Sequence, residues 1–577
     1  MGRCVLAGFG KKSVRGGARM HGRTKGLFLV PILVAILLVG ALGGGCTSNT
    51  PATSGRPTTS TSASPSGAEQ PTGELKIATG NLGKEMLDPT LDAGSSDKAM
   101  RTLMFDFLVG STVDGQLSKD YGLARDWKVQ QSGNSSVYTF DLRQGVKFHD
   151  GTEVAAEDVK FSLEYFTRKE SSTVYAAPLR DAIDRIEVPS QYQMVVYTKM
   201  PYAFLLTDLS SLGYVEGIVL PKAYIEKNET DYFNKNPIGT GPYRFREQKR
   251  GTSITFEAID YRHWLQQPRY KTVTLMLVPE ESTRIAMLKT KEADVIDSVS
   301  RANISSLETA GLWVVSKKGN LVVTVQLGQT WDEGTYLHDV RVREALNLAV
   351  DRQAILDQVF KKAGSVTGSS YYGSWAYGYR PMPLYDYDPA KAKSLLEQAI
   401  KDKGWSKVEL TFHSFDRPGV PELPLVAEAM AGEWQKTFGD LINVQVVPLD
   451  FAVVRQRLVG KKAPNSLAFV SIANKLTWNS TQRTFFVPGG LFTLATTPDL
   501  TALLDKLQGE LDMDKVGQLQ NQSARYIRDN HFAVPLFELD ELQSADPKKV
   551  PQWDMGKFVQ DPNYRDIMVR GRAYPAQ

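Results

Sequence analysis

With 577 residues, the chain is longer than one hydrophobic core usually supports, so we expect at least two lobes. It carries 68 lysines and arginines against 64 aspartates and glutamates, but seven of the basic residues and none of the acidic ones fall within residues 1–46. Without that segment, 61 basic and 64 acidic residues remain, a net charge of −3. The charge balance therefore gives no argument for nucleic-acid binding.

The chain opens with the order of charged and apolar residues that is typical of a secretory signal. Arg23 and Lys25 stand directly before an uncharged apolar run at residues 27–42. The run is slightly long for the core of a signal peptide and slightly short for a bilayer span. An uncleaved anchor helix is therefore the alternative interpretation, and both place the body of the protein outside the cytoplasm, tethered to a membrane.

Residues 42–46 (LGGGC) resemble a bacterial lipobox, in which the cysteine sulfur is acylated and the signal is removed. Gly43 departs from the pattern, because leucine is usual there. We expect residues 1–46 to be a lipoprotein signal peptide and Cys46 to become the lipidated end of the mature chain. The only other cysteine is Cys4, within the signal, so thiol catalysis, thiolate metal sites and disulfides are excluded from the mature body.

Threonine, serine and proline dominate residues 47–73, where only Arg56 and Glu69 are charged. Such a composition cannot bury enough apolar surface to offset its ordering entropy. We therefore predict a disordered tether between the membrane and the folded body. A flexible segment of this length spans about 30 Å root-mean-square.

Strands and helices alternate along the remainder of the chain. Alternating apolar and polar residues predict strands at 136–143, 253–259 and 321–327. Residues 342–349 place one apolar stripe at helical spacing, and Asp351 is a predicted N-cap for the next helix. Asp388 followed by proline predicts the start of a further helix. This interleaving indicates an α/β fold.

Four segments resemble the family 5 extracellular solute-binding proteins, which are the peptide and nickel receptors of ABC importers. They stand in the order and at roughly the spacing of that family. The segments are residues 147–162 (containing KFHDG and EDVKFS), 237–243 (PIGTGPY), 341–352 (RVREALNLAVDR) and 387–396 (YDPAKAKSLL). The resemblance runs from about residue 75 to the C-terminus.

Most residues of these segments are interpreted as structural. Gly151 permits a turn, while Glu157 and Asp158 suit the N-terminus of a helix. Ala155 stands where the family usually has a threonine cap. The glycines of residues 237–243 form a turn that lacks the third glycine of a dinucleotide-binding loop, so we discount phosphate binding there.

The resemblance implies a two-lobed α/β receptor of the type II periplasmic-binding-protein kind, in its large form with an extra subdomain and a hinge between the lobes. In this chain the N-terminal lobe would comprise residues 74–315, with the extra subdomain at about 110–235, and would be completed by residues 530–577. Residues 316–529 would form the C-terminal lobe.

The chain would cross between the lobes near residues 312–326 and again near 526–534. The resemblance further implies that ligand is trapped between the lobes and that the closed form docks on a membrane permease driven by an ATPase. Closure of this kind needs neither catalysis nor a cofactor. We expect a monomer that is not an enzyme and binds no nucleic acid.

The segment that follows a strand of the C-terminal lobe points to the ligand. Peptide-binding members have a tryptophan there, and an aspartate that pairs with the α-amino group of the peptide. The corresponding stretch is residues 467–479, and no aspartate or glutamate occurs from 451 to 498. That region instead holds six cations: Arg455, Arg457, Lys461, Lys462, Lys475 and Arg483.

The ligand is therefore predicted to be neutral, anionic, or a peptide that is N-blocked or held internally. The alternative is that the cations form a solvated face and that an acidic residue elsewhere pairs with the amine. The candidate ligand-binding residues of this region are Asn474, Trp478, Asn479 and Arg483.

A second group of candidates comes from aromatic residues in loops, which can stack on sugars or line peptide pockets. Packing under a long loop is the alternative for these aromatics. The candidates are Tyr371, Tyr372 and Trp375, together with Gln329 and Trp331, which follow the predicted strand 321–327.

Other functions have less support. The histidines are scattered, so no metal site is predicted, although a nickel chelate could be held by one histidine and arginines. An oligosaccharide receptor, a ligand-sensing lipoprotein without import, and an adhesion protein remain alternatives.

Overall fold

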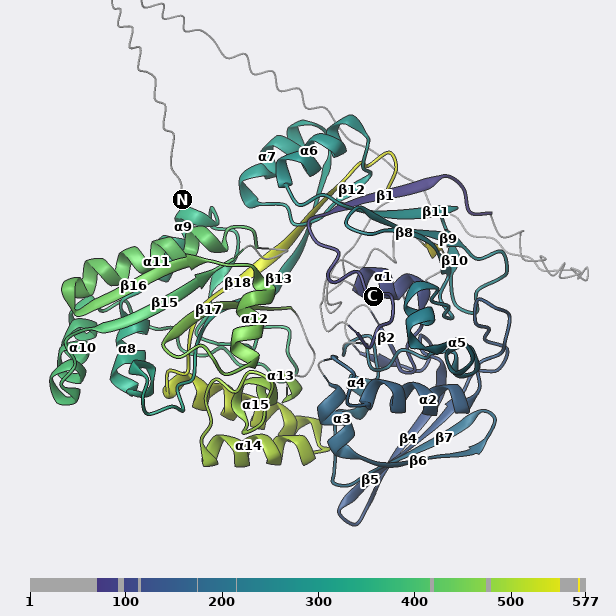
Figure 1. Cartoon of the computed structure of the whole chain (residues 1–577), viewed down its shortest axis with the longest axis horizontal. Helices are drawn as coiled ribbons and strands as arrows, with labels where there is room; N and C mark the ends of the chain where they lie inside the picture. The colour runs from purple at the N-terminus through teal and green to yellow at the C-terminus, as the bar shows by residue number, and fades with distance from the viewer. Residues whose placement is uncertain are drawn as a thin grey trace, which may run out of the picture. The chain divides into compact units, whose positions relative to one another are not determined.

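The computed structural model describes residues 70–91, 98–112, 116–173, 175–213, 215–415, 420–473, 479–550 and 569–570 (Figure 1). The predicted signal peptide, Cys46 and residues 47–69 of the predicted tether lie outside these residues. Residues 67–577 form one compact unit, and the fold described below belongs to it. None of the helices within the described ranges is long and apolar enough to cross a membrane.

One eleven-stranded mixed sheet runs through this unit. Its strands are, in spatial order, β16 (Ile442–Pro448), β15 (Val408–Ser414), β17 (Ser466–Ala473), β13 (Trp313–Leu327), β18 (Ala533–Ala545), β12 (Val295–Ile296), β1 (Glu74–Thr79), β11 (Thr272–Leu277), β9 (Ser253–Ala258) and β8 (Tyr243–Lys249), with β14 (Ser365–Val366) added on β18. The strands predicted at 253–259 and 321–327 are confirmed by β9 and β13.

The two longest strands, β13 and β18, lie in the middle of this sheet. They pair antiparallel from Trp313 opposite Ala545 to Gln326 opposite Ala533. At one end β18 also pairs with β12, and at the other end β13 also pairs with β17. Each long strand therefore belongs to both halves of the sheet. The boundaries predicted at 315 and 530 fall inside β13 and just before β18.

A second, four-stranded antiparallel sheet has the order β4-β5-β7-β6 and falls within the predicted extra subdomain. Its strand β5 confirms the strand predicted at 136–143. The strands are β4 (Ala124–Ser132), β5 (Ser135–Leu142), β6 (Ile183–Ser190) and β7 (Gln193–Thr198). Two small sheets pair β2 (Gly110–Ser111) with β3 (Leu117–Ser118) and β10 (Gln267–Pro268) with β19 (Val569–Arg570).

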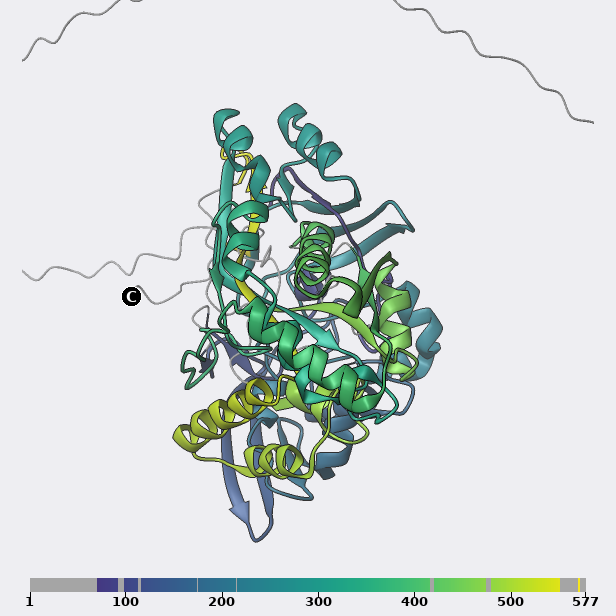
Figure 2. The same ribbon diagram turned by 90° about the vertical axis from the view of Figure 1, so that its left-hand side faces the viewer.

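Helices accompany both sheets, and α14 lies against α15 in both views (Figure 1, Figure 2). The helices of the first half are α1 (Lys98–Met104), α2 (Ala156–Thr167), α3 (Ala176–Ala182), α4 (Leu205–Asp208), α5 (Lys222–Lys235), α6 (Glu281–Thr290) and α7 (Ile304–Thr309). Those of the second half are α8 (Val340–Leu348), α9 (Arg352–Val359), α10 (Pro389–Lys403), α11 (Leu423–Phe438), α12 (Phe451–Val459), α13 (Asn479–Phe486), α14 (Pro498–Gly509) and α15 (Met513–Asp529).

The caps expected from the sequence are present at α9 and α10. The Asp351 carboxylate accepts the backbone N–H of Ala354, and the Asp388 carboxylate accepts that of Lys391 with a proline in the first turn. The apolar stripe predicted at 342–349 is buried in α8. These local signals were sufficient to locate the starts of the two helices, because each cap satisfies a backbone donor that the helix itself cannot satisfy.

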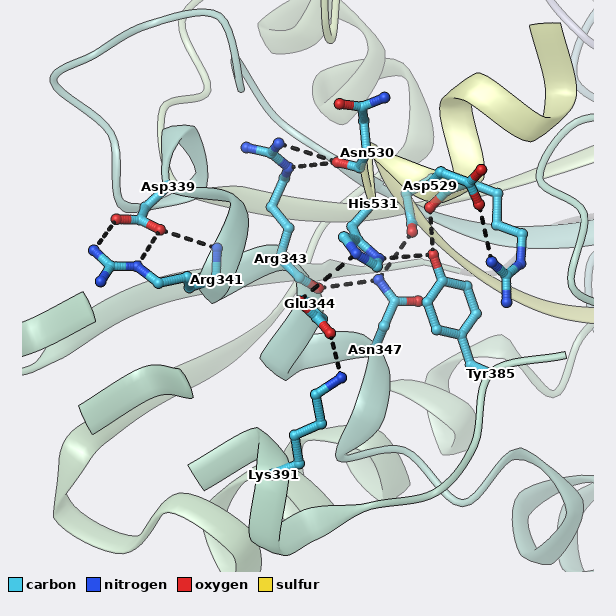
Figure 3. Close-up of polar contacts among 12 residues, drawn as sticks. Asp339, Arg341, Arg343, Glu344, Asn347, Tyr385, Lys391, Asp529, Asn530 and His531 are labelled. Atoms are coloured by element: carbon cyan, nitrogen blue, oxygen red, sulfur yellow. Dashed lines mark hydrogen bonds and ion pairs between the residues drawn. The ribbon is translucent and has the colours of Figure 1, made fainter. Parts of the chain in front are cut away.

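The segment at residues 341–352 fastens two helices to the start of β18. The Arg343 guanidinium donates two hydrogen bonds to the carbonyl oxygen of Asn530, at 3.0 and 3.1 Å (Figure 3). The Asn347 amide donates to the carbonyl oxygen of Ala533, and Arg352 Nε donates to that of Pro535. Side chains of α8 and α9 thus occupy backbone acceptors along the entry to β18.

The first two family segments also contact each other directly, through His149. Its Nδ1 accepts the backbone N–H of Gly239 at 3.2 Å, so the proton lies on Nε2, which donates to the carbonyl oxygen of Gly241 at 2.9 Å. Burial lowers the pKa of His149 to about 4, despite the favourable contact with the carbonyl. Protonation would place a second N–H against Gly239, so the neutral ring is built into the fold.

This histidine predicts a pH dependence of stability. Its folded-state pKa lies below the ordinary value, so the unfolded chain binds the proton more tightly. Its contribution is complete above about pH 6.5 and is lost as the pH falls toward 4. Between pH 7 and pH 5 the parent should lose about 2 kcal/mol that His149→Asn does not lose, measured by urea unfolding. A constant difference between the two proteins at both pH values would contradict this.

Candidate functional site

The pairing of β13 with β18 is interrupted at its centre. Lys317 lies opposite Glu541 and Leu321 lies opposite Leu539, so three residues of β13 face one residue of β18, Asp540. Such a bulge bends a strand and increases its local twist. It falls between the part of the sheet that β12 extends and the part that β17 extends.

The carboxylate of Asp540 holds this bulge in place. It accepts the backbone N–H of Gly319 at 2.9 Å, the Ser316 hydroxyl at 3.1 Å and the Lys318 ammonium at 2.6 Å. Gly319 has a φ of +54°, which is the left-handed region that glycine adopts most readily. One buried side chain therefore supplies the hydrogen bonds that the interrupted ladder cannot.

The aromatic loop that contains Trp375 is attached to the same bulge. The indole Nε1 of Trp375 donates to the carbonyl oxygen of Gly319 at 2.8 Å. Beside it, the backbone N–H and hydroxyl of Ser374 donate to the carboxylate of Glu538 on β18. Burial raises the pKa of Glu538, and the hydrogen bonds from Ser374 oppose that rise.

A buried ion pair between Arg301 and Glu422 is attached to the bulge through Asp540. Arg301 Nη1 lies 3.1 Å from a carboxylate oxygen of Glu422, and Arg301 Nη2 donates to the carbonyl oxygen of Asp540. Both side chains of the pair are nearly inaccessible, with 1% and 9% of their surface exposed. Arg301 belongs to the predicted N-terminal lobe and Glu422 to the predicted C-terminal lobe.

The edge at which Glu422 lies has the geometry of a ligand site. Strand β15 is parallel to both β16 and β17, so the carboxyl ends of the three strands point to one edge of the sheet. Ligands of α/β sheets bind outside such an edge. Glu422 follows β15 in the chain and Asn479 opens α13 after β17.

Of the candidates after β17, Asn474 and Trp478 lie outside the described residues. Asn479 is 2% exposed, and its Oδ1 has no hydrogen-bond partner within the part of the chain that the structure describes. Arg483 forms an ion pair with Asp505 of α14, with 2.6 Å between Nη1 and Oδ1. The ligand-binding role of these four residues stays a prediction.

The first two aromatic candidates are buried in the structure. Tyr371 and Tyr372 are both 0% exposed, and the ring of Tyr371 lies 4.9 Å from that of Phe485 and 5.4 Å from that of Phe486. The Tyr372 hydroxyl donates to the carbonyl oxygen of Tyr377. This arrangement favours the alternative interpretation that these aromatics pack beneath a long loop.

Gln329 and Trp331 lie at the other end of the β13–β17 pairing. Leu327 is opposite Leu467, whereas Leu321 is opposite Ala473. The six residue steps from 321 to 327 correspond to about 20 Å of strand. Gln329 accepts the backbone N–H of Ala463, and Trp331 donates to the carbonyl oxygen of Thr493. The structure thus separates these two candidates from the carboxyl end of β17.

The place where β13 pairs with β18 between the two halves of the sheet is called the crossover below. No sequence pattern pointed to the charged residues that hold it together: Arg301, Glu422, Glu538 and Asp540. Residues 317–320 (KKGN) gave a usable signal, because a glycine among polar residues inside a strand pattern often marks a bulge. Among the described residues, no group of three histidine, cysteine, aspartate or glutamate side chains could hold a metal ion.

Residues 120–485 match the family model of bacterial extracellular solute-binding proteins, family 5. The chain belongs to this family. A curated relative, the dipeptide-binding protein of Escherichia coli strain K12, is 30% identical over 344 residues, which are 55% of this chain and 61% of the relative. The chain thus matches about three-fifths of that relative's length.

Solved structures of two-lobed binding proteins share the fold. The binding protein DppA of Helicobacter pylori in complex with the peptide STSA superposes with a TM-score of 0.74 at 21% identity, covering 87% of this chain and 98% of that one. NikA of Staphylococcus aureus in complex with Ni(L-His)2 superposes with a TM-score of 0.70 at 18% identity, covering 84% and 97%. The solute-binding protein described here therefore has the two-lobed fold of its family.

Breaking the buried ion pair should destabilise the solute-binding protein strongly. Glu422→Gln leaves the Arg301 charge buried without its partner, and we expect a loss of about 3 kcal/mol in the free energy of unfolding. Glu428 is exposed on α11, the helix that Glu422 directly precedes, and it supplies the control. Glu428→Gln should change stability by less than about 0.5 kcal/mol. Equal effects in urea unfolding would contradict the role assigned to the pair.

Proposed function

We propose that this protein is the substrate-binding lipoprotein of an ABC importer. It captures an oligopeptide or a polar solute of similar size between its two lobes and delivers it to a membrane permease coupled to an ATPase. The observation that carries the proposal is the crossover, where β13 and β18 belong to both halves of the sheet and a bulge interrupts their pairing. Family membership supports it.

The position of the protein in the cell forms part of the proposal. Family members are extracytoplasmic, and residues 1–73 have the composition of a signal, a lipid attachment site and a tether. We propose a monomer anchored to the membrane through lipid on Cys46. A tethered receptor searches for its permease within a thin layer above the bilayer, which raises the effective concentration.

The proposed class of ligand rests on the absence of acidic residues near β17, while the cations there are open to solvent. Arg457, Lys461 and Lys462 are exposed, Arg455 is half-buried, and none of the four forms an ion pair with a described residue. Because no acidic residue occurs from 451 to 498, the prediction stays a neutral or anionic solute, or a peptide that is N-blocked or held internally. A receptor for an oligosaccharide or a metal chelate, and a sensor without import, are the alternatives.

The function can be tested on the full chain purified from membranes. Native followed by denaturing mass spectrometry should release a bound solute, because ligand at 100 times its dissociation constant adds about 2.7 kcal/mol of stability. Adding that solute back should shrink the protein in small-angle scattering and stimulate ATP hydrolysis by the reconstituted permease. Closure without stimulation would favour a sensor, and no closure would contradict both binding functions.

The missing carboxylate provides a second test. Asn474→Asp should restore a partner for a free amino terminus and tighten the binding of free-amine tripeptides about tenfold, measured by calorimetry. The exposed Asn443 of β16 supplies a matched control, because Asn443→Asp adds the same charge elsewhere. If both variants bind such peptides as the parent does, residue 474 is not the amine subsite.

A further inference from the structure

A contact outside the crossover also joins the two predicted lobes. The backbone N–H of Ala203 donates to the carbonyl oxygen of Gln508 at 3.2 Å. Ala203 lies in the predicted extra subdomain, shortly before α4, whereas Gln508 lies in the last turn of α14, in the predicted C-terminal lobe. The two lobes therefore meet at a place to which neither β13 nor β18 contributes.

This hydrogen bond helps to complete the end of a helix. Because α14 ends at Gly509, its last carbonyl oxygens have no donor one turn further along the helix. The backbone N–H of Glu510 donates to the carbonyl oxygen of Leu507, and that of Ala203 donates to the carbonyl oxygen of Gln508. The extra subdomain thus supplies a donor to a helix of the other lobe.

The loop that carries Ala203 is fixed within its own subdomain. The Tyr138 hydroxyl of β5 donates to the carbonyl oxygen of Tyr202, and the Tyr202 hydroxyl donates to the Asp208 carboxylate at 2.7 Å. These three residues are no more than 2% exposed. The loop therefore does not depend on α14 for its position, and the contact joins two surfaces that are each already formed.

Close packing accompanies the hydrogen bond. A Cβ atom at Gly509 would lie 3.7 Å from the Cβ of Pro201 and 3.9 Å from its carbonyl oxygen, which is ordinary van der Waals contact. Buried apolar residues on the two sides belong to one cluster, which includes Tyr202, Phe204, Leu500, Leu504 and Leu507. The two surfaces thus touch at more than one point.

We propose that residues 201–203 and residues 508–509 form a latch, which holds the lobes together in the closed form and separates when they open. This inference rests on the proposed function, because it concerns closure around a solute. Rotation about the bulge opposite Asp540 moves one lobe relative to the other. A contact between the lobes outside the bulge has to break during that movement.

The latch gives the extra subdomain a role in the retention of solute. One hydrogen bond of this kind shifts an equilibrium about fivefold, so the latch favours the closed form without preventing release. It contacts the protein rather than the solute, and it therefore stabilises the closed form by the same amount for every solute. The latch changes how long a solute is held and leaves the preference among solutes unchanged.

A disulfide across the latch provides the test. Pro201→Cys combined with Gly509→Cys places two Cβ atoms 3.7 Å apart, within the range that a disulfide requires. The natural cysteines are Cys4, in the predicted signal peptide, and Cys46, whose sulfur is the proposed site of lipid attachment. The full-length variant is purified from membranes, dialysed free of bound solute and measured by small-angle scattering. Oxidised, it should keep one compact radius of gyration, and under reductant it should expand as the parent does.

An arginine variant tests the latch without a cross-link. Gly509→Arg places a long side chain against Pro201, so the closed population of the solute-free protein should fall about fivefold in scattering, with the oxidised cysteine variant as the closed reference. Gly432 of α11 supplies the matched control, because a Cβ there would meet nothing within 4 Å. Gly432→Arg should match the parent, and equal closed populations in the two arginine variants would overturn the inference.

The cross-link also separates the latch from the proposed function. Cysteines that do not pair in the folded protein, or an oxidised variant with the same radius of gyration as the reduced one, would overturn the latch. A variant that is held compact by oxidation and released by reductant, from a parent that stimulates no permease with any solute, would support the latch and overturn the function.

Discussion

The antiparallel pairing of β13 with β18 is the constraint on which the rest of the structure depends. The two strands continue one sheet across both halves of the protein, and the proposed closure also requires a place between those halves where they can turn. A ladder of regular hydrogen bonds would resist such a turn. The bulge opposite Asp540 removes the ladder locally and replaces it with bonds to one carboxylate. In the proposed closure of the lobes, rotation about this point would change a few dihedral angles and leave the flanking ladders intact.

Buried arginines hold the elements around this point. Burial lowers the pKa of Arg343 and of Arg352 to about 10, so both remain charged at neutral pH, and both donate to backbone carbonyl oxygens. A guanidinium offers five donors in a planar arrangement, so one side chain can fix several acceptors. Arg301 does the same where it joins Glu422 to the carbonyl oxygen of Asp540. These bonds hold the start of β18 to α8 and α9, and its centre to Arg301.

The sequence predicted what depends on local physics. Periodic apolar residues located α8, and Asp351 and Asp388 located two helix starts, because each signal lies within a few residues. The crossover was only half predicted. The strand at 321–327 alternates clearly, but residues 317–320 are polar, and their strand character comes from a partner about 220 residues away. Tyr371 was judged from loop composition, which cannot show that Phe485 and Phe486 cover its ring.

Exposed and buried polar groups differ in what they require of a solute. The cations near β17 are exposed or half-buried, and water can satisfy them, so their presence sets no requirement on the solute. A buried polar group that a solute can reach would set one, because the wrong solute would leave that group unsatisfied. Specificity comes mainly from groups that are left unsatisfied by the wrong ligand. By that criterion the absence of acidic residues from 451 to 498, rather than the presence of the cations, bears on the proposed class of ligand.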